Sequence, residues 1–386
     1  MSSTWGVIMV APDTGTLLSG EWAFNGAGTV TSAAMTQAVA GELPESGTGS
    51  GAYNVSNNAQ TLSGNVSLSF PSGNLAVDLA GAINNPTIFS NTFDTQIPPG
   101  QPDFAGGTAS LNGGAVHALT VACLPDANAS TDSVNASFEV FGENIGPGDF
   151  GAPSTQAGLL SMGNGTISSG LVTGNLMGTY TITNGVVAGT ATFGNSTDTI
   201  SGFVALDGTI ELAISGTEDA MVLVAVPLPS IPSANVSSSY AFFSDLTFPP
   251  SVMSGQLNLG LETTPAPLPP CSAPCTPPNF GGFPVNPSTI AVVDSPATDN
   301  TTLANGSWIT DSDANVQLTG TLGFSATLPI SLTSGSGGGA ATSDTLFPNG
   351  AFDADFTYGI GFMLDNFQTF GQGGGLTIVI ETGEQP

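Results

Sequence analysis

A short pattern recurs three times along this chain of 386 residues: an aromatic residue, a turn, a glycine and a strand that ends in phenylalanine. The aromatic residues lie 127 residues (53 to 180) and 128 residues (180 to 308) apart. Solenoid repeats are only about 20–50 residues long, so this period is that of a domain. We therefore predict three tandem domains, with equivalent core positions for these residues: Tyr53, Gly64 and Phe70; Tyr180, Gly189 and Phe193; Trp308, Gly320 and Phe324.

Apolar and small polar residues alternate between the turns, as in half-buried strands. Asn65–Phe70, Thr209–Ile214 and Leu376–Ile380 show this alternation. Asn-Gly and Asp-Gly pairs at 25, 164, 184 and 207 separate such runs and favour tight hairpins. With 52 Gly and 28 Pro in the chain, helix formers are scarce. We predict an all-β protein of antiparallel domains, each an up-and-down barrel or a sandwich.

Each predicted domain opens on an aromatic strand and closes on an apolar one. The opening strands begin at Trp5, Phe138 and Tyr240, and the closing strands are 119–122, 221–226 and 376–380. Short linkers rich in Pro, Asn and Ser follow the first two closing strands and should be fairly stiff. The predicted domains are 1–126, 133–228 and 235–386, the last with a Pro-rich, Cys-containing insertion at about 261–287.

The chain contains no lysine and no arginine, and its 29 carboxylates give a formal charge of −29 at pH 7. Only 8% of its residues are charged, which does not fit a halophilic protein. Carboxyl groups titrate near pH 4, so in strong acid this chain is close to neutral, whereas an ordinary protein accumulates positive charge. Trypsin-like proteases also find no cleavage site. The composition favours an acidic or protease-rich environment. The alternative is an amino-acid composition bias shared by the proteins of a whole lineage.

The same absence excludes several partners. Nucleic acids and anionic membrane surfaces attract Lys and Arg, so neither is expected to bind. No apolar stretch reaches the length of a transmembrane helix. No basic, apolar leader is visible at the start of the sequence, so we expect any signal peptide to have been removed. We predict an extracellular or cell-surface protein that needs no cofactor.

One string resembles the active-site loop of an acid protease, in which two Asp residues share a proton. It contains Asp13 in Asp-Thr-Gly-Thr, and Asp207 lies at the position expected for the partner loop. However, Asp207 lacks the intervening Thr, and Pro12 is unsuited to a central strand. We interpret both as ordinary β-turns and predict no enzymatic activity.

Other candidate sites are weaker. His117 is the single histidine and has no evident nucleophile or fellow zinc ligand. Asp311, Asp313 and Asn315 have the opening spacing of a calcium loop, but Val316 replaces its required glycine, so we favour a polar turn. Nine Asn-X-Ser/Thr sequons are compatible with an exposed surface, although an Asn-rich chain gives several by chance.

The three cysteines divide into a pair and a remainder. Cys271 and Cys275 lie among prolines in the predicted insertion, where we expect a local disulfide. Cys123 is then left over, and either a buried free thiol or an intermolecular bond would account for it. We favour the buried thiol.

Three functions remain open. The first is a structural subunit of a filament, sheath or surface layer, forming a homopolymer through β-edges and apolar patches. The second is a barrel that binds an apolar or glycan ligand, and the third is a secreted acid hydrolase. For assembly, the strand with Leu376, Ile378 and Ile380 either closes the third domain or is donated to a neighbouring subunit. We favour the structural subunit and the closing strand.

Overall fold

The computed structural model describes 21 segments of the chain, and the statements below concern these residues. They are 2–12, 14–39, 41–56, 60–84, 102–114, 116–145, 154–171, 174–193, 196–216, 220–227, 238–247, 250–259, 280–286, 289–294, 297–302, 306–310, 315–319, 326–330, 342–352, 358–365 and 373–384. All regular structure in them is strand, which confirms the predicted all-β class of tandem antiparallel domains.

The first domain is a closed barrel in which each strand pairs with the next and β1 pairs with β8. Closure removes the free sheet edges, so an eight-stranded barrel needs no partner to satisfy its backbone. Its interior holds a mixture of aromatic and small residues, which fill the space together. The strands are β1 (Ser2–Ala11), β2 (Thr16–Asn25), β3 (Thr29–Val39), β4 (Glu45–Val55), β5 (Thr61–Phe70), β6 (Gly73–Ile83), β7 (Phe104–Leu111) and β8 (Val116–Cys123).

The second domain is a closed barrel of the same topology, with β9 paired to both β10 and β16. Two of its hairpins turn at Asn164-Gly165 and Asn184-Gly185, where both residues have positive φ, as a type I′ turn requires. The strands are β9 (Ala136–Asn144), β10 (Ser154–Gly163), β11 (Thr166–Leu171), β12 (Gly174–Thr183), β13 (Val186–Phe193), β14 (Ser196–Val204), β15 (Ile210–Ser215) and β16 (Ala220–Pro227).

The third domain contains eleven strands, eight of which form the same closed circuit. Since β17 pairs with both β18 and β27, the circuit runs β17, β18, β19, β22, β23, β25, β26 and β27. The hairpin β20–β21 pairs with β18, and β24 pairs with β25, so both are additions to the circuit.

The strands of the third domain follow the chain order. They are β17 (Ser238–Thr247), β18 (Pro250–Leu259), β19 (Phe280–Asn286), β20 (Thr289–Asp294), β21 (Ala297–Thr302), β22 (Gly306–Thr310), β23 (Asn315–Thr319), β24 (Ala326–Ile330), β25 (Thr342–Phe352), β26 (Tyr358–Asp365) and β27 (Gly373–Glu384). The segment 280–286, which the sequence analysis places in the insertion, is therefore a strand of the circuit.

The recurring aromatic residue lies on the fourth strand of each circuit: Tyr53 on β4, Tyr180 on β12 and Trp308 on β22. In the two barrels it pairs directly with the glycine of the pattern, Gly64 or Gly189. An aromatic ring opposite a glycine covers the bare backbone and fixes the register. Trp308 instead pairs with Leu318. Phe70 and Phe193 are buried, whereas Gly320 and Phe324 lie outside the described residues.

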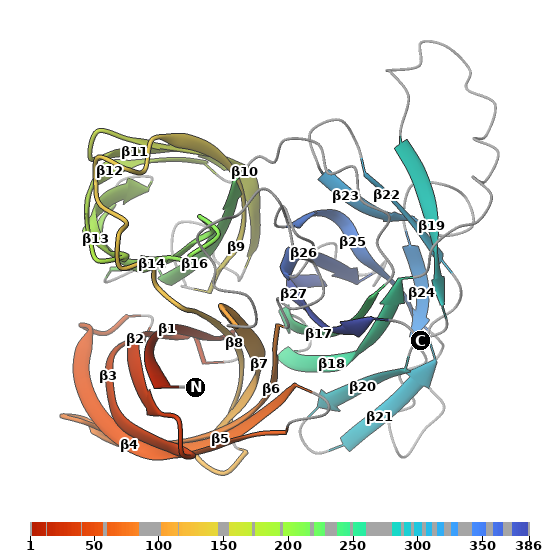
Figure 1. The fold of residues 1–386 in the computed structure, drawn as a ribbon, viewed down its shortest axis with the longest axis horizontal. Helices are drawn as coiled ribbons and strands as arrows, with labels where there is room; N and C mark the ends of the chain where they lie inside the picture. The colour runs from red at the N-terminus through yellow and green to blue at the C-terminus, as the bar shows by residue number, and fades with distance from the viewer. Residues whose placement is uncertain are drawn as a thin grey trace.

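The three domains surround a common centre (Figure 1). A single apolar cluster there contains residues from the outer faces of all three, among them Val121, Val224 and Ile378 from the closing strands β8, β16 and β27. These three strands are buried on both faces, which explains their continuous apolar sequences. We call this cluster the central core. Burial of apolar surface in the central core stabilises the arrangement of the three domains. Ion pairs with Lys or Arg make no contribution, because the chain contains neither residue.

Candidate functional site

The most unusual feature of the described residues is a set of carboxyl groups that are buried, without a cation, where domains meet. Glu143 on β9 and Asp245 on β17 are both fully buried. Each lies two residues after an aromatic residue of the central core, Phe141 or Phe243. These aromatic residues pair with equivalent positions of the closing strands, Val224 and Ile378. The two carboxyl groups therefore occupy equivalent sites in the second and third domains, and they meet where these domains touch.

Glu143 and Asp245 lie close enough for the charge of one to affect the other, and none of their four carboxyl oxygens has a hydrogen-bond partner among the described residues. Two buried negative charges this close repel each other, so the site favours a proton on at least one group. Burial raises the pKa of Glu143 well above its usual range, and Asp245 raises it further. Burial likewise raises the pKa of Asp245, to about 6. The boundary between the second and third domains thus contains a carboxyl pair whose protonated form is favoured by burial.

A second buried carboxyl group joins the first and second domains. Glu211 on β15 is fully buried near the thiol of Cys123 on β8, and neither of its carboxyl oxygens has a hydrogen-bond partner among the described residues. Burial raises the pKa of Glu211 to about 8; the neighbouring Cys123 thiol opposes this shift and the charge of Asp207 adds to it. Burial and the nearby Glu211 raise the pKa of the Cys123 thiol well above its usual range. A thiol of high pKa is unreactive, which fits a structural role for this cysteine.

The first and third domains meet through rings and glycine rather than carboxyl groups. Phe104 on β7 stacks on Tyr358 on β26, with ring centroids 4.4 Å apart and planes 13° apart. A Cβ on Gly106 would overlap the terminal methyl groups of Ile378 and Ile380 on β27, so these side chains pack directly against the bare backbone of β7. Gly6 in the same way makes room for the ring of Phe203 between the first and second domains.

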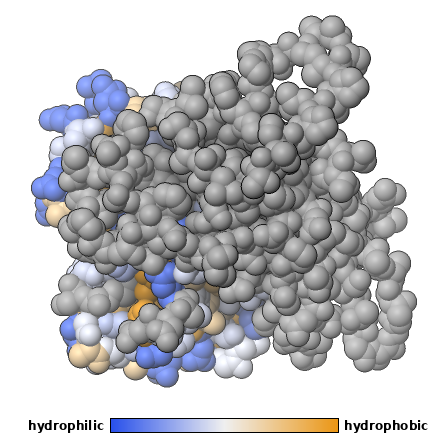
Figure 2. Space-filling model, turned by 45° about the vertical axis from the view of Figure 1, so that its right-hand side comes forward, coloured by the Kyte–Doolittle hydropathy of each residue, from blue (hydrophilic) through white to orange (hydrophobic). Residues whose placement is uncertain are grey.

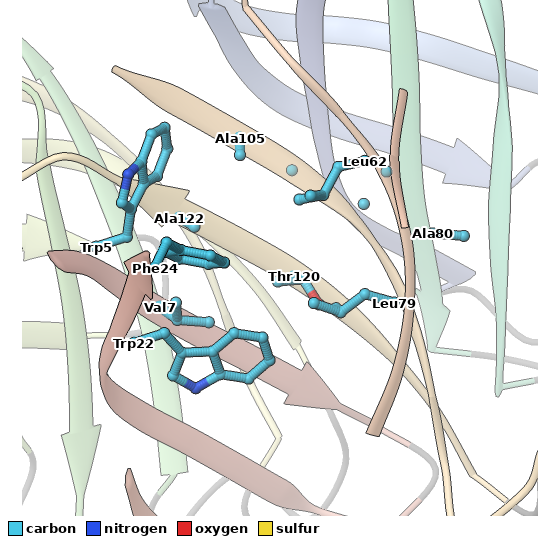
Figure 3. A pocket seen from close by; sticks show the side chains of 13 residues that line it. Trp5, Val7, Trp22, Phe24, Leu62, Leu79, Ala80, Ala105, Thr120 and Ala122 are labelled. Atoms are coloured by element: carbon cyan, nitrogen blue, oxygen red, sulfur yellow. The ribbon is translucent and has the colours of Figure 1, made fainter. Parts of the chain in front are cut away.

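The interior of the first barrel contains a small apolar cavity of about 30 Å³ (Figure 3). Trp5, Trp22 and Phe24 form one wall, and the other lining residues include Thr120, whose hydroxyl is buried without a hydrogen-bond partner. Pockets for small-molecule ligands usually measure about 300–1,000 Å³. A cavity of this size holds a water molecule or two. It does not support a carrier of apolar ligands.

The acid-protease hypothesis gains no support from the described residues. Asp13 lies outside them, so its position relative to Asp207 is not described. The carboxylate of Asp207 accepts hydrogen bonds from the backbone N–H (2.8 Å) and the hydroxyl (2.7 Å) of Thr209. This is a local turn contact, as the sequence analysis expects.

The hydroxyl of Ser110 lies 3.4 Å from Nδ1 of His117, a contact that the sequence analysis missed. Asp78 pairs with Ser110 on the other side, so the three residues form a row across β6, β7 and β8. The serine lies between the acid and the histidine, whereas a catalytic triad needs the histidine in the middle. The row also lies outside both of the cavities described in this chain.

The remaining candidates fall mostly outside the described residues. Asp311 and Asp313 of the calcium hypothesis lie there, and Asn315 begins β23. Cys271 and Cys275 also lie there. The residues that the structure describes contain no cluster of three or more His, Cys, Asp or Glu side chains able to hold a metal ion. Within them, no helix is long and apolar enough to cross a membrane.

Both edges of the candidate assembly strand, β27, are paired with strands of the same chain. β27 pairs with β17 along one edge and with β26 along the other, and Leu376, Ile378 and Ile380 point into the central core. This arrangement is that of a closing strand, the alternative favoured by the sequence analysis.

Sequence reasoning missed the buried carboxyl groups, although a signal for two of them is present. Glu143 and Asp245 each lie five residues after the aromatic residue that opens their domain, Phe138 or Tyr240. The first domain has Val10 at the same distance from Trp5. An acid at the same site in two copies of an apolar strand indicates a role beyond solubility.

Comparison of the chain with protein-family models, with curated protein sequences and with solved structures found no match.

Proposed function

We propose that this protein is an extracellular or cell-surface structural subunit, stable in acid, that assembles with copies of itself into a filament, sheath or layer. The observation that carries the proposal is the complete burial of carboxyl groups where domains meet. A carboxyl group buried without a cation is compatible with the fold only while the solution is acidic enough to protonate it. Glu143, Asp245 and Glu211 are of this kind, so acid favours the docked arrangement of the three domains within one chain.

Surface chemistry supports self-association under the same conditions. At low pH the surface carboxylates lose their charge, and a chain without cations retains almost no electrostatic repulsion between copies. Among the described strands, β21 pairs only with β20, and β24 pairs only with β25. Each has an open backbone edge, and such edges template pairing with another chain. We propose that copies join through these edges and through apolar contacts rather than through ion pairs.

Electron microscopy of the negatively stained full-length chain tests the proposal, with light scattering of the same samples. We expect polymers at pH 3 and mostly discrete particles at pH 7. A variant in which a short Gly-Ser linker replaces 289–302 lacks the β20–β21 hairpin but keeps the eight strands of the circuit, so it should polymerise less. Discrete monomers at pH 3, at every concentration up to the solubility limit, would refute self-assembly.

A further inference from the structure

A groove of about 310 Å³ lies between the outer faces of the first and second barrels. It reaches the size of small-molecule sites, which occur preferentially where domains meet. β2, β3 and β4 form one wall, and β13 and β14 form the other. A hydrogen bond between the hydroxyls of Ser19 and Ser201, 2.9 Å long, joins the two walls.

The wall on the first barrel carries two cross-strand rows, in which five of the six side chains are polar. One row is Ser19, Thr36 and Ser46, and the other is Glu21, the apolar Ala34 and Thr48. Hydroxyls both donate and accept hydrogen bonds, and a carboxylate accepts them strongly. The wall on the second barrel adds the apolar Val186 beside Ser201. The groove thus offers hydroxyl and carboxyl groups on one side and an apolar contact nearby, which suits a ligand that itself has hydroxyl groups and C–H surfaces.

The polar surface continues from the groove onto the second barrel. Beyond Ser201, the outer face of β14 carries Thr199 and Thr197. Thr199 belongs to a straight cross-strand row of four exposed threonines, Thr166, Thr179, Thr190 and Thr199. Neighbouring strands lie about 4.8 Å apart, so this row presents hydroxyls at a regular spacing of that size. We call these four residues the threonine row. It extends the groove into a surface long enough for a chain-like ligand.

Charge restricts the ligand further. Neither wall has a cation, and the chain has no Lys or Arg anywhere, so phosphate, sulfate and carboxylate groups find no counter-charge. Glu21 and the net charge of −29 repel anions at neutral pH. Nucleic acids and acidic polysaccharides are therefore excluded by the same chemistry that admits neutral sugars. We propose that the groove and the threonine row bind a neutral polysaccharide chain, an activity that does not depend on self-assembly.

Calorimetric titration with three soluble hexasaccharides tests this proposal: β-1,4-linked glucose, α-1,4-linked glucose and N-acetylglucosamine. The protein is kept at pH 5 and at a concentration where light scattering shows monomers, so failure of assembly does not affect the result. We expect saturable binding of at least one probe. Ala34→Trp fills the groove from its exposed wall and should weaken that binding by about tenfold or more. Ala52→Trp, at an exposed position of β4 outside the groove, is the matched control and should bind as the parent does.

Two further variants separate the parts of the site. Thr48→Val removes one groove hydroxyl without adding bulk, and gives a second measure if Ala34→Trp fails to fold. The double substitution Thr190→Val and Thr199→Val should weaken hexasaccharide binding severalfold and leave the melting temperature nearly unchanged. Absence of binding for all three probes at millimolar concentration would overturn the proposal. Parental affinity in both Ala34→Trp and Thr48→Val would also overturn it, since binding would then occur elsewhere.

Discussion

Strands β12 and β16 belong to the same barrel, yet they differ in what their outer faces contain. Outward positions of β12 carry Thr179, Thr181 and Thr183, all exposed, and the strand alternates polar and apolar residues. Outward positions of β16 carry Val222, Val224 and Val226, all in the central core. The inward faces of both strands are apolar. The difference shows that the barrel interior specifies the domain, whereas the outward residues of a few strands specify how the domains are arranged.

Carboxyl groups follow the same division. The described surface visible in Figure 2 is mostly blue and white, that is hydrophilic to neutral, with a few orange patches, and at such a surface a carboxylate remains in contact with water at little cost. In and around the central core, Glu143, Glu211 and Asp245 are withdrawn from water with no cation to compensate them. The free-energy cost of removing a charged carboxylate from water is avoided when the group keeps its proton and stays neutral. Four predictions test whether the outward faces and the buried acids have these separate roles.

Removing residues 371–386 should have the largest effect. The truncation deletes β27, which closes the third circuit and contributes Leu376, Ile378 and Ile380 to the central core. We expect loss of cooperative thermal unfolding by circular dichroism and rapid digestion by chymotrypsin. Removal of Gln385 and Pro386 alone is the control and should leave both unchanged. A truncated chain that melts like the parent would show that β27 is dispensable.

Raising the pH from 4 to 8 should destabilise the protein. The pKa of Glu211 is about 8 in the folded state against 4.5 for the free side chain. Its contribution to stability is therefore fully present below about pH 4.5 and is lost as the pH rises toward 8. A shift of this size corresponds to on the order of 5 kcal/mol. Chemical denaturation at a series of pH values measures the loss, and Glu211→Gln should reduce it. Glu42→Gln, at an exposed position, should leave the profile unchanged.

Asp245→Asn should stabilise the protein at pH 8 relative to the parent. The amide is neutral at every pH, so the substitution removes the buried charge that Asp245 acquires when it loses its proton. From the raised pKa of Asp245, about 6, the gain is on the order of 3 kcal/mol at pH 8 and close to zero at pH 4. Urea denaturation at the two pH values gives the comparison. Equal effects at both would mean that protonation of the pair is not what links the domains.

A reciprocal exchange between β16 and β12 should give the smallest effects. Val224→Thr places a hydroxyl in the central core and should cost about 1–3 kcal/mol. Thr179→Val changes an exposed position and should alter the free energy of unfolding by no more than about 0.5 kcal/mol. Denaturation curves of the two variants, collected together, measure the difference. If both cost the same, the outward face of β16 has no special role.

Much of the fold could be predicted from the sequence because its signals are local. Alternation, Asn-Gly turns and the aromatic–glycine pattern each involve neighbouring residues or one hairpin, and the Tyr53–Gly64 and Tyr180–Gly189 pairs are such hairpin contacts. The prediction of a Pro-rich insertion at about 261–287 includes the residues of β19, whose own Gly281, Gly282 and Pro284 disfavour a strand. This segment is a strand nevertheless, since pairing with β22 outweighs the local preference.

The central core could not be predicted in the same way. A continuous apolar run such as 221–226 shows that both faces of a strand are buried, but periodicity carries no information about what covers the second face. The buried acids could not be recognised from the sequence for the same reason: Glu143 and Asp245 are neighbours only after two domains have docked. The groove also arises from docking, because its walls are more than a hundred residues apart in the chain.

The closure of each circuit by its last strand has a consequence for the rate and order of folding. Most strand pairs are hairpins between neighbouring segments, which form quickly. The pairs β1–β8 and β17–β27 join strands that are far apart in the chain, as the pairing of Gly6 with Cys123 shows, and they form only after the later strand is available. During synthesis the first two barrels can close in turn while the third remains incomplete. Because β27 also contributes to the central core, the three domains cannot dock fully until β27 has emerged. Formation of this strand therefore limits the docking of the three domains, and a chain synthesised only as far as β26 retains an uncovered apolar face.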